Sequence, residues 1–194
     1  MYFLFVLMLT LIVAPVILLI SLVLCIVQGF PVLFCQKRIG LGGKPFTMYK
    51  FRTMRVGAEF EQGKLRKYNE ADGPVFKIRN DPRFTKVGKF LAHTGLDELP
   101  QLYNVLVGDM ALIGPRPLPV EEAAKLTRVQ KKRHDIKPGI ISPWVLDGYH
   151  RQTFDAWMKS DIAYGKKKSF LYDLTLAIRT IGFLTSLFIR EVCG

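Results

Sequence analysis

The first 36 residues contain no Asp, Glu, Lys or Arg, although the chain of 194 residues carries a net charge of +12. Basic residues begin abruptly after this segment. Residues 37–93 contain 14 Lys and Arg against 5 Asp and Glu, whereas residues 94–194 contain 14 against 11. An uncharged apolar segment followed by a strongly basic one indicates an anionic partner close to a membrane.

Cysteine is scarce, and the three that occur are Cys25, Cys35 and Cys193. They are odd in number and lack the spacing of metal ligands. They therefore fit a reducing compartment and indicate no chemistry of their own. The length of the chain suits one domain with a moderate core.

Residues 1–27 are apolar except for Thr10, Pro15 and Ser21. A straight helix of this length would be roughly 40 Å long, enough to cross a bilayer core of about 30 Å. The segment has no basic start and no small-residue cleavage site, so a signal peptide is not expected.

Pro15 lies in the middle of this segment and predicts a kink near Ala14, because proline removes one backbone hydrogen bond and clashes with the preceding turn. The helix then either crosses the bilayer or enters and leaves the same leaflet, and we favour the re-entrant course. We expect residues 1–28 to form the membrane anchor and residues 29–194 to form a separate domain on one side of the membrane.

The most informative stretch is residues 94–117, TGLDELPQLYNVLVGDMALIGPRP. Asp97 and Glu98 precede a proline, and apolar residues then recur at helical spacing up to Gly108. This pattern predicts a short helix with both carboxylates at its N-terminus, either as ordinary caps or as part of a phosphate site. The GPRP segment favours the site, because two prolines fix the backbone around Arg116 and present its guanidinium for an oxyanion.

The segments LDELPQL, NVL, GDM and GPRP, at this spacing, resemble the bacterial sugar transferase family, the monotopic phosphoglycosyl transferases. The resemblance runs from about residue 10 to residue 182. It implies a helix-rich α/β monotopic membrane protein, with an N-terminal re-entrant helix, a small β-hairpin and interfacial amphipathic helices around a compact catalytic domain. It also implies a location on the cytoplasmic face of the bacterial inner (plasma) membrane.

The resemblance further implies a reaction and its participants. Such an enzyme transfers a sugar 1-phosphate from a UDP-sugar to undecaprenyl phosphate, releases UMP, and initiates glycoconjugate or exopolysaccharide assembly. Asp97 is the expected covalent nucleophile with Glu98 beside it. In the alternative, the lipid phosphate attacks directly and Asp97 only holds metal. Mg²⁺ is the expected cofactor, with Asp97 and Glu98 as its ligands, because it pairs with few carboxylates plus substrate phosphates.

Two β-rich runs within residues 29–55 flank Leu41-Gly42-Gly43 and predict a β-hairpin. Most of its basic residues are expected to face lipid headgroups or solvent. The KFRTM segment resembles a basic motif of the family near the active site. The later GPVFKIRNDPR segment resembles family enzymes that transfer hexose phosphates onto polyprenyl phosphate. The predicted substrate-binding residues are Lys50, Arg52, Arg79, Arg116 and Arg151.

Several positions depart from the family pattern. Family members commonly have Arg five residues before the catalytic Asp, whereas this chain has Ala92. The neighbouring His93 either meets a phosphate in its place or is simply packed. The family's Gly-Arg is also absent near Gly148, so that arginine is either displaced to Arg151 or its role is lost.

The C-terminal half shows two further helical patterns. Residues 119–134 predict one helix with acidic residues in its first turn and basic residues in its last. Residues 171–192 predict a helix that lies either along the membrane interface or in the core. Asp161, Tyr164 and Asp173 match late family positions and are expected to be structural ties.

A different class of function explains part of the same pattern. A non-enzymatic membrane module that binds anionic lipid or nucleic acid would account for the apolar segment and the basic charge. It assigns no purpose to Asp97-Glu98 beside the GPRP segment. We therefore favour the enzyme and expect no nucleic-acid partner.

Overall fold

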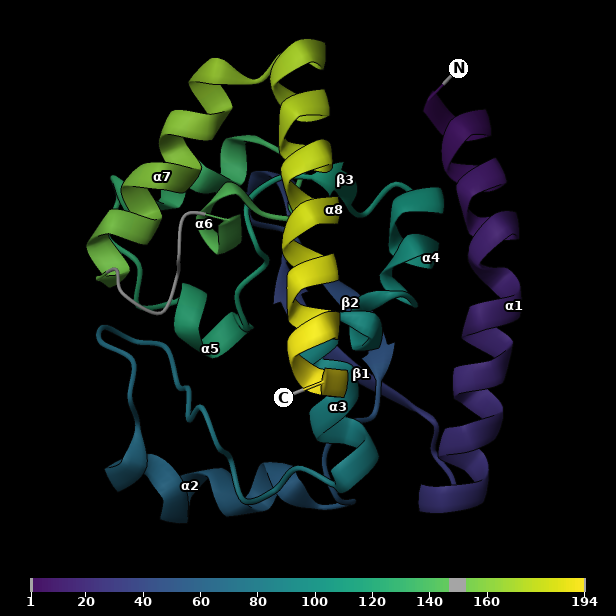
Figure 1. The fold of residues 1–194 in the computed structure, drawn as a ribbon. Helices are drawn as coiled ribbons and strands as arrows, with labels where there is room; N and C mark the ends of the chain where they lie inside the picture. Colours follow the sequence, from purple (N-terminus) through teal and green to yellow (C-terminus); the bar gives the residue numbers. More distant parts are fainter. Residues whose placement is uncertain (1, 147–152, 194) are drawn as a thin grey trace.

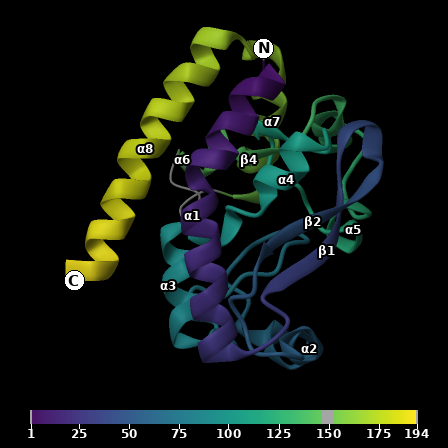
Figure 2. The same cartoon turned by 90° about the vertical axis from the view of Figure 1, so that its right-hand side faces the viewer.

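A long apolar helix, α1 (Tyr2–Gln28), runs along one side of the molecule (Figures 1 and 2). The structure is a computed structural model that describes residues 2–146 and 153–193. Within these residues α1 is the one helix long and apolar enough to cross a membrane. It continues as a helix through the exposed Pro15, and the sharp bend expected near Ala14 is not visible in Figure 1. A re-entrant course in a bilayer stays a prediction.

One face of α1 is packed against the rest of the chain near both of its ends. Val6 is buried with Met48 and Met110, and Leu24 is buried with Phe51. The opposite face leaves most of its large apolar side chains exposed. The helix is therefore attached to the domain near both of its ends and presents an apolar surface outward.

The predicted β-hairpin is confirmed. Strands β1 (Leu33–Ile39) and β2 (Pro45–Phe51) are antiparallel, with a register that runs from Leu33↔Phe51 to Ile39↔Pro45. The turn between them is η1 (Leu41–Gly43), where Gly42 and Gly43 have positive φ angles of 64° and 76°. Glycine adopts this backbone conformation without steric cost, so the glycine pair closes the hairpin.

After the hairpin, the chain forms three short helical pieces and then the helices that carry the acidic pair. The short pieces are η2 (Ala58–Glu61), α2 (Gln62–Leu65) and η3 (Arg66–Tyr68). Helix α3 (Lys86–Thr94) follows, and η4 (Leu96–Glu98) and α4 (Gln101–Leu106) come next. A Cβ atom added at Gly88 would lie 1.8 Å from the Thr53 carbonyl oxygen, so α3 packs directly on the backbone that leaves β2.

A second small sheet pairs β3 (Ala111–Ile113) with β4 (Gly139–Ile141) in parallel. Between these strands the predicted single helix over residues 119–134 is wrong. The structure has α5 (Val120–Ala123) and a separate η5 (Gln130–Asp135). Thr127 and Gln130 exchange side-chain to backbone hydrogen bonds of 2.9 and 3.3 Å, a reciprocal cap that begins a new helical turn.

The chain ends with α6 (Pro143–Leu146), α7 (Phe154–Lys167) and α8 (Phe170–Cys193). Figure 2 shows α8 on the side of the molecule opposite the hairpin. Tyr164 is a structural tie as predicted, because its hydroxyl lies 2.8 Å from Asp173 Oδ1 and 3.1 Å from the Ile113 carbonyl. The described residues thus confirm a helix-rich α/β fold with small sheets and one apolar N-terminal helix.

Candidate active site

The acidic pair lies in the tight turn η4, directly after α3. Gly95 ends α3 with a positive φ of 74°, and the chain reverses there so that Asp97 turns inward. Asp97 is only 7% exposed, and Glu98 is half-buried. Burial first and the neighbouring Glu98 second raise the pKa of Asp97 to about 6, against the opposing influence of Lys50 and Arg116. A shift of this size occurs at reactive sites and in structural ion pairs, so the neighbours of Asp97 decide its role.

Arg116 meets this pair from the GPRP segment. One of its guanidinium nitrogens lies 2.6 Å from Glu98 Oε1 in a half-exposed ion pair. The backbone around Arg116 is held from two sides. Arg133 donates a 2.6 Å hydrogen bond to the carbonyl of Arg116, and Arg38 donates a 2.8 Å hydrogen bond to the carbonyl of Pro117. The predicted presentation of Arg116 is therefore reinforced by two other arginines.

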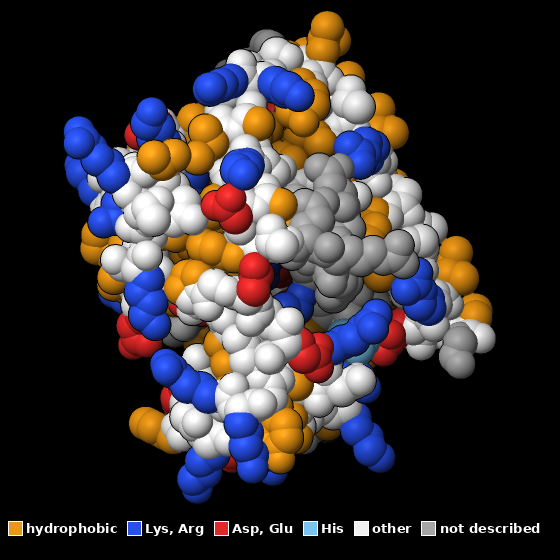
Figure 3. Space-filling view, turned by 90° about the vertical axis from the view of Figure 1, so that its left-hand side faces the viewer, with side chains coloured by type: hydrophobic (Ala, Val, Ile, Leu, Met, Phe, Trp, Pro, Cys, Tyr) orange, Lys and Arg blue, Asp and Glu red, His pale blue; other side chains and the backbone are white. Residues whose placement is uncertain are grey.

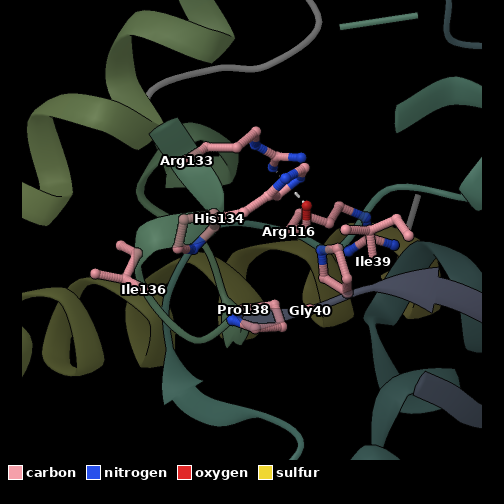
Figure 4. Close-up of a pocket in the computed structure, with 9 residues that line it drawn as sticks. Ile39, Gly40, Arg116, Arg133, His134, Ile136 and Pro138 are labelled. Atoms are coloured by element: carbon pink, nitrogen blue, oxygen red, sulfur yellow. Dashed lines mark hydrogen bonds between the residues drawn. The ribbon is translucent and has the colours of Figure 1, made fainter. Parts of the chain in front are cut away.

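Figure 4 shows Arg133 reaching from η5 to the Arg116 carbonyl beside a cavity of about 10 Å³. This cavity is too small for a substrate and lies under the loop that carries Arg116. Arg133 is itself anchored, because its Nε and Nη2 lie 2.9 and 2.6 Å from Asp161 Oδ2. Asp161 is thus a structural tie, as predicted.

Two glycines let the Arg116 loop approach the loop before β4. A Cβ atom at Gly114 would lie 2.5 Å from the Lys137 carbonyl oxygen, and one at Gly139 would lie 2.1 Å from the Gly114 nitrogen. Backbone hydrogen bonds join the loops, including one of 3.0 Å from the Gly139 nitrogen to the Pro115 carbonyl. Side chains at either glycine would separate the loops and displace Arg116.

The hairpin contributes the basic side of the site. Phe34 lies opposite Lys50 in the register, and the Lys50 ammonium lies 5.5 Å from the centre of the Phe34 ring. Burial lowers the pKa of Lys50, while Asp97 opposes that change. Arg38 projects from the same face of the hairpin, since it lies four residues along the strand from Phe34. Burial and the nearby Arg116 lower its pKa to about 10.

Asn104 fixes the distance between the hairpin and the acidic turn. It is fully buried on α4, and its side-chain amide forms hydrogen bonds with the backbone of β2, as the backbone of a neighbouring strand would. Its Oδ1 accepts from the Tyr49 nitrogen at 3.1 Å, and its Nδ2 donates to the Thr47 carbonyl at 2.7 Å. The asparagine of the NVL segment is therefore a clamp that keeps Lys50 beside Asp97.

The structure thus brings together four of the predicted site residues: Asp97, Glu98, Lys50 and Arg116. Arg52 makes different contacts, since its Nη2 donates to the carbonyls of Gln28 and Gly29 at the end of α1. Arg79 is exposed, and its charge acts on the nearby Lys77. Roles for Arg52 and Arg79 in substrate binding stay predictions. Arg151 lies outside the described residues.

His93 is paired with the last helix. Its Nδ1 lies 3.2 Å from a carboxylate oxygen of Glu191 on α8, and its ring packs edge-on against Phe84. Of the two roles considered for His93, these contacts correspond to the packed one. Ala92 on α3 has no charge, so it does not replace the absent arginine.

Sequence reasoning missed Lys77 as a site residue. Burial first and the Arg116 charge second lower the pKa of Lys77 to about 7. Lys77 comes close to Arg116 because the loop after η3 folds toward it. Nothing in the sequence distinguishes Lys77 from the other lysines of the basic segment. Arg38 was detectable, because alternation along the strand places it on the same face as Lys50.

The chemistry of this arrangement is that of an anion-binding site with an acidic centre. Lys50, Arg38, Lys77 and Arg116 surround it with positive charge, which suits a substrate with more than one phosphate. Figure 3 shows that Lys and Arg side chains also cover much of the margin of the face that carries α7. The basic side chains on this face favour the approach of an anionic substrate to it.

A metal ion would have few protein ligands here. Within residues 2–146 and 153–193, no group of three or more His, Cys, Asp and Glu side chains is placed to hold a metal. Asp97 and Glu98 nevertheless repel each other, as the raised pKa of Asp97 indicates. Two carboxylates of this kind fit Mg²⁺ when substrate phosphates supply further oxygen ligands.

Comparison with known proteins gives one matching family model, described as bacterial sugar transferase, over residues 1–186. Among similar proteins is the galactosyl transferase CpsE of Streptococcus agalactiae serotype III (strain NEM316), 44% identical over 155 residues, or 79% of this chain and 34% of the relative. Another is the UDP-glucose:undecaprenyl-phosphate glucose-1-phosphate transferase of Escherichia coli (strain K12), 36% identical over 180 residues, or 88% and 36%.

A third relative is nearer in length to this chain. It is the putative undecaprenyl-phosphate N-acetylgalactosaminyl 1-phosphate transferase of Bacillus subtilis (strain 168), 39% identical over 148 residues. The match covers 76% of this chain and 72% of that protein. The chain therefore spans about a third of the length of the first two relatives and most of the length of the third.

Proposed function

Because the chain belongs to the bacterial sugar transferase family, we propose that it transfers a sugar 1-phosphate from a UDP-sugar to undecaprenyl phosphate and releases UMP. The observation that carries this proposal is the buried Asp97, on which the charges of Lys50 and of the Glu98–Arg116 ion pair act. Two relatives are named for transfer to undecaprenyl phosphate, one of them with UDP-glucose as donor. The product would initiate glycoconjugate or exopolysaccharide assembly.

The proposed reaction has two displacements at one phosphorus atom. A carboxylate oxygen of Asp97 attacks the phosphorus that bears the sugar, and the bond from this phosphorus to the oxygen of UMP breaks. UMP leaves with the bonding electron pair, and Asp97 holds the sugar phosphate as an acyl phosphate. A phosphate oxygen of undecaprenyl phosphate then attacks the same phosphorus and returns Asp97 to its free carboxylate.

Asp97 must be ionised for the first displacement. Its raised pKa of about 6 leaves the carboxylate mostly charged at neutral pH and more nucleophilic than an ordinary exposed aspartate. Lys50 and Arg116 counter the repulsion between this anion and the donor diphosphate. The Glu98–Arg116 pair, fixed through Arg133 and Arg38, keeps the guanidinium beside the reacting phosphate.

Mg²⁺ is the proposed cofactor, held by Asp97 and Glu98. When bound it would neutralise charge on the donor diphosphate and so assist departure of UMP. Activity should then disappear in EDTA and return with added Mg²⁺. Full turnover in the chelator would remove the ion from the mechanism.

We further propose that residues 1–28 anchor the protein in the inner membrane with residues 29–194 on the cytoplasmic face. The outward apolar surface of α1 supports an anchor, and contacts near both ends of α1 support an N-terminus that stays on the side of the domain. A cysteine at position 2, in a chain without Cys25, Cys35 and Cys193, should be labelled only from the cytoplasm. Labelling only from the periplasm would exclude the re-entrant form.

The decisive test of the activity is UMP release from a panel of UDP-sugars, with the purified full chain and detergent-dispersed undecaprenyl phosphate. At least one donor should give UMP and a lipid-linked sugar diphosphate, and Asp97→Asn should give neither. No UMP with any donor would favour the non-enzymatic membrane module.

A further inference from the structure

A second concave site lies at the C-terminal end of α1, between that helix and the N-terminus of α3. It encloses about 400 Å³, a volume within the usual range for small-molecule sites. Figure 2 shows this end of α1, together with α3 and α2, at the same end of the molecule. The lining residues are Val27, Gln28, Arg52, Arg55, Val56, Thr85, Lys86 and Val87.

The deepest polar group of this pocket is only partly satisfied. Arg52 is 6% exposed, and its Nη2 donates to the carbonyls of Gln28 and Gly29 at 2.6 and 2.8 Å. Its Nε and Nη1 are buried and have no hydrogen-bond partner among the described residues, and the same holds for the side-chain amide of Gln28. Buried donors on a charged group are costly without an acceptor, so this site is suited to an anion with several oxygen atoms.

The rest of the lining has the same sign of charge. Arg55 and Lys86 add two exposed cations, and the lining residues include no acidic side chain. Glu61 approaches from outside the lining and pairs with Arg55 at 3.2 Å in an exposed contact. Thr85 caps α3, whose first-turn amides add partial positive charge at this end. The pocket is therefore cationic on one side and, through Val27, Val56 and Val87, apolar on the other.

The surface around the pocket is apolar and outward-facing. Phe30 and Phe60 are 80% and 83% exposed, and Ile26 and Val56 are also largely exposed. Ile26 and Phe30 lie at the end of the apolar sequence of α1, and Val56 and Phe60 lie within the basic segment. A lipid whose acyl chains cover these residues would place its phosphate at the depth of Arg52.

This pocket is separate from the acidic site. Lys86 begins α3 and Asp97 follows its end, so the two lie at opposite ends of a nine-residue helix about 14 Å long. We propose that the pocket binds the phosphodiester headgroup of an anionic glycerophospholipid of the surrounding membrane. The inference goes beyond the transferase reaction and does not depend on it.

The test is native mass spectrometry of the full chain, stripped of lipid and then mixed with micelles that contain equal amounts of phosphatidylglycerol and phosphatidylcholine. One phosphatidylglycerol should be retained per chain in preference to phosphatidylcholine. Lys86→Gln and Arg55→Gln should each lower this retention about fivefold, since each removes one cation that faces the lipid phosphate. Lys89→Gln is the matched control, because Lys89 is exposed on the same helix but does not line the pocket.

Arg52→Gln should abolish selective retention, but it also removes contacts to the end of α1. If the Arg52 variant unfolds, Lys86→Gln provides the test. Equal retention of both lipids, or equal losses in the Lys86 and Lys89 variants, would overturn the proposal. Added farnesyl phosphate should bind without displacing phosphatidylglycerol. Displacement would instead assign the pocket to an isoprenyl phosphate, and displacement by millimolar inorganic phosphate would assign it to the free anion.

Discussion

Two buried aspartates of this protein differ in what surrounds them. Asp161 is fully buried, and Asp97 is 7% exposed. The pKa of each is raised to about 6, and burial is the largest cause. For Asp161 the strongest opposing influence is Arg133, which it meets at 2.6 and 2.9 Å. For Asp97 the next influence after burial is Glu98, which raises the pKa further, and Asp97 forms no ion pair among the described residues.

The comparison separates a structural carboxylate from a reactive one. The Asp161–Arg133 pair holds the backbone of Arg116, and Oδ2 of Asp161 accepts both of its hydrogen bonds from Arg133. Asp97 is ionised without such a pair. This lowers the stability of the fold but leaves a carboxylate that is free to react. Substitution of each aspartate by asparagine should therefore have opposite consequences for stability and activity.

The largest expected effect is on the activity of Asp97→Asn. Turnover should fall by more than about a thousandfold, because the amide cannot attack phosphorus. Asparagine keeps the shape of the side chain, so the fold should survive. If Asp97 were only a helix cap, near-normal activity would remain, since Asn caps about as well as Asp.

The same variant should be more stable than the unmodified chain at pH 7 to 8. A shift of the pKa from 3.8 to about 6 corresponds to roughly 3 kcal/mol, as an upper bound. The raised pKa means that the folded state binds the proton more tightly, so Asp97 destabilises the fold increasingly as the pH rises from about 4 to 6. Urea unfolding should show the gain above pH 7 and little gain near pH 4.

Asp161→Asn should instead destabilise the protein, by up to about 3–5 kcal/mol, because the buried Arg133 loses its counter-charge and this loss exceeds the gain from removing a carboxylate whose pKa is raised by burial. Urea unfolding measures the loss directly. The matched control is Asp155→Asn, which breaks the exposed Asp155–Lys159 pair of 3.0 Å on α7 and should change stability by less than about 1 kcal/mol. Similar losses in both variants would contradict a special structural role for Asp161.

A smaller effect, the pH dependence of the reaction rate, shows which of the two aspartates titrates during the reaction. The rate of donor-dependent UMP release should rise with pH and level off above about 6, as Asp97 ionises. Glu98→Gln should slow the reaction and move the midpoint to lower pH, because it removes the charge that raises the pKa of Asp97. A slower reaction with an unmoved midpoint would assign the titration to another group, such as Asp161.

Much of the fold follows from local sequence patterns. The apolar N-terminal helix, the hairpin around Gly42-Gly43 and the acidic turn before α4 all have periodic or glycine signals that act over a few residues. The division of residues 119–134 was missed, because the reciprocal cap of Thr127 and Gln130 outweighs a favourable charge order along the segment.

The candidate site was predictable only in part. Asp97, Glu98 and Arg116 lie in one stretch of sequence, so their proximity could be expected. The support from Arg133 and Asp161, and the nearness of Lys77, depend on contacts between distant segments that no local pattern encodes. Arg52 follows Lys50 by two residues, and its contact with the end of α1 is another that no local pattern encodes; its role in substrate binding stays a prediction.

The most direct measurement of the central claim is the intact mass of the full chain after rapid quenching from incubation with UDP-sugar alone. If Asp97 is the nucleophile, the protein gains the mass of one sugar phosphate and releases UMP before any lipid acceptor is added, and Asp97→Asn gains nothing. An enzyme that turns over with acceptor present but never gains this mass would contradict the covalent route, and would leave Asp97 as a metal ligand for direct attack by the lipid phosphate.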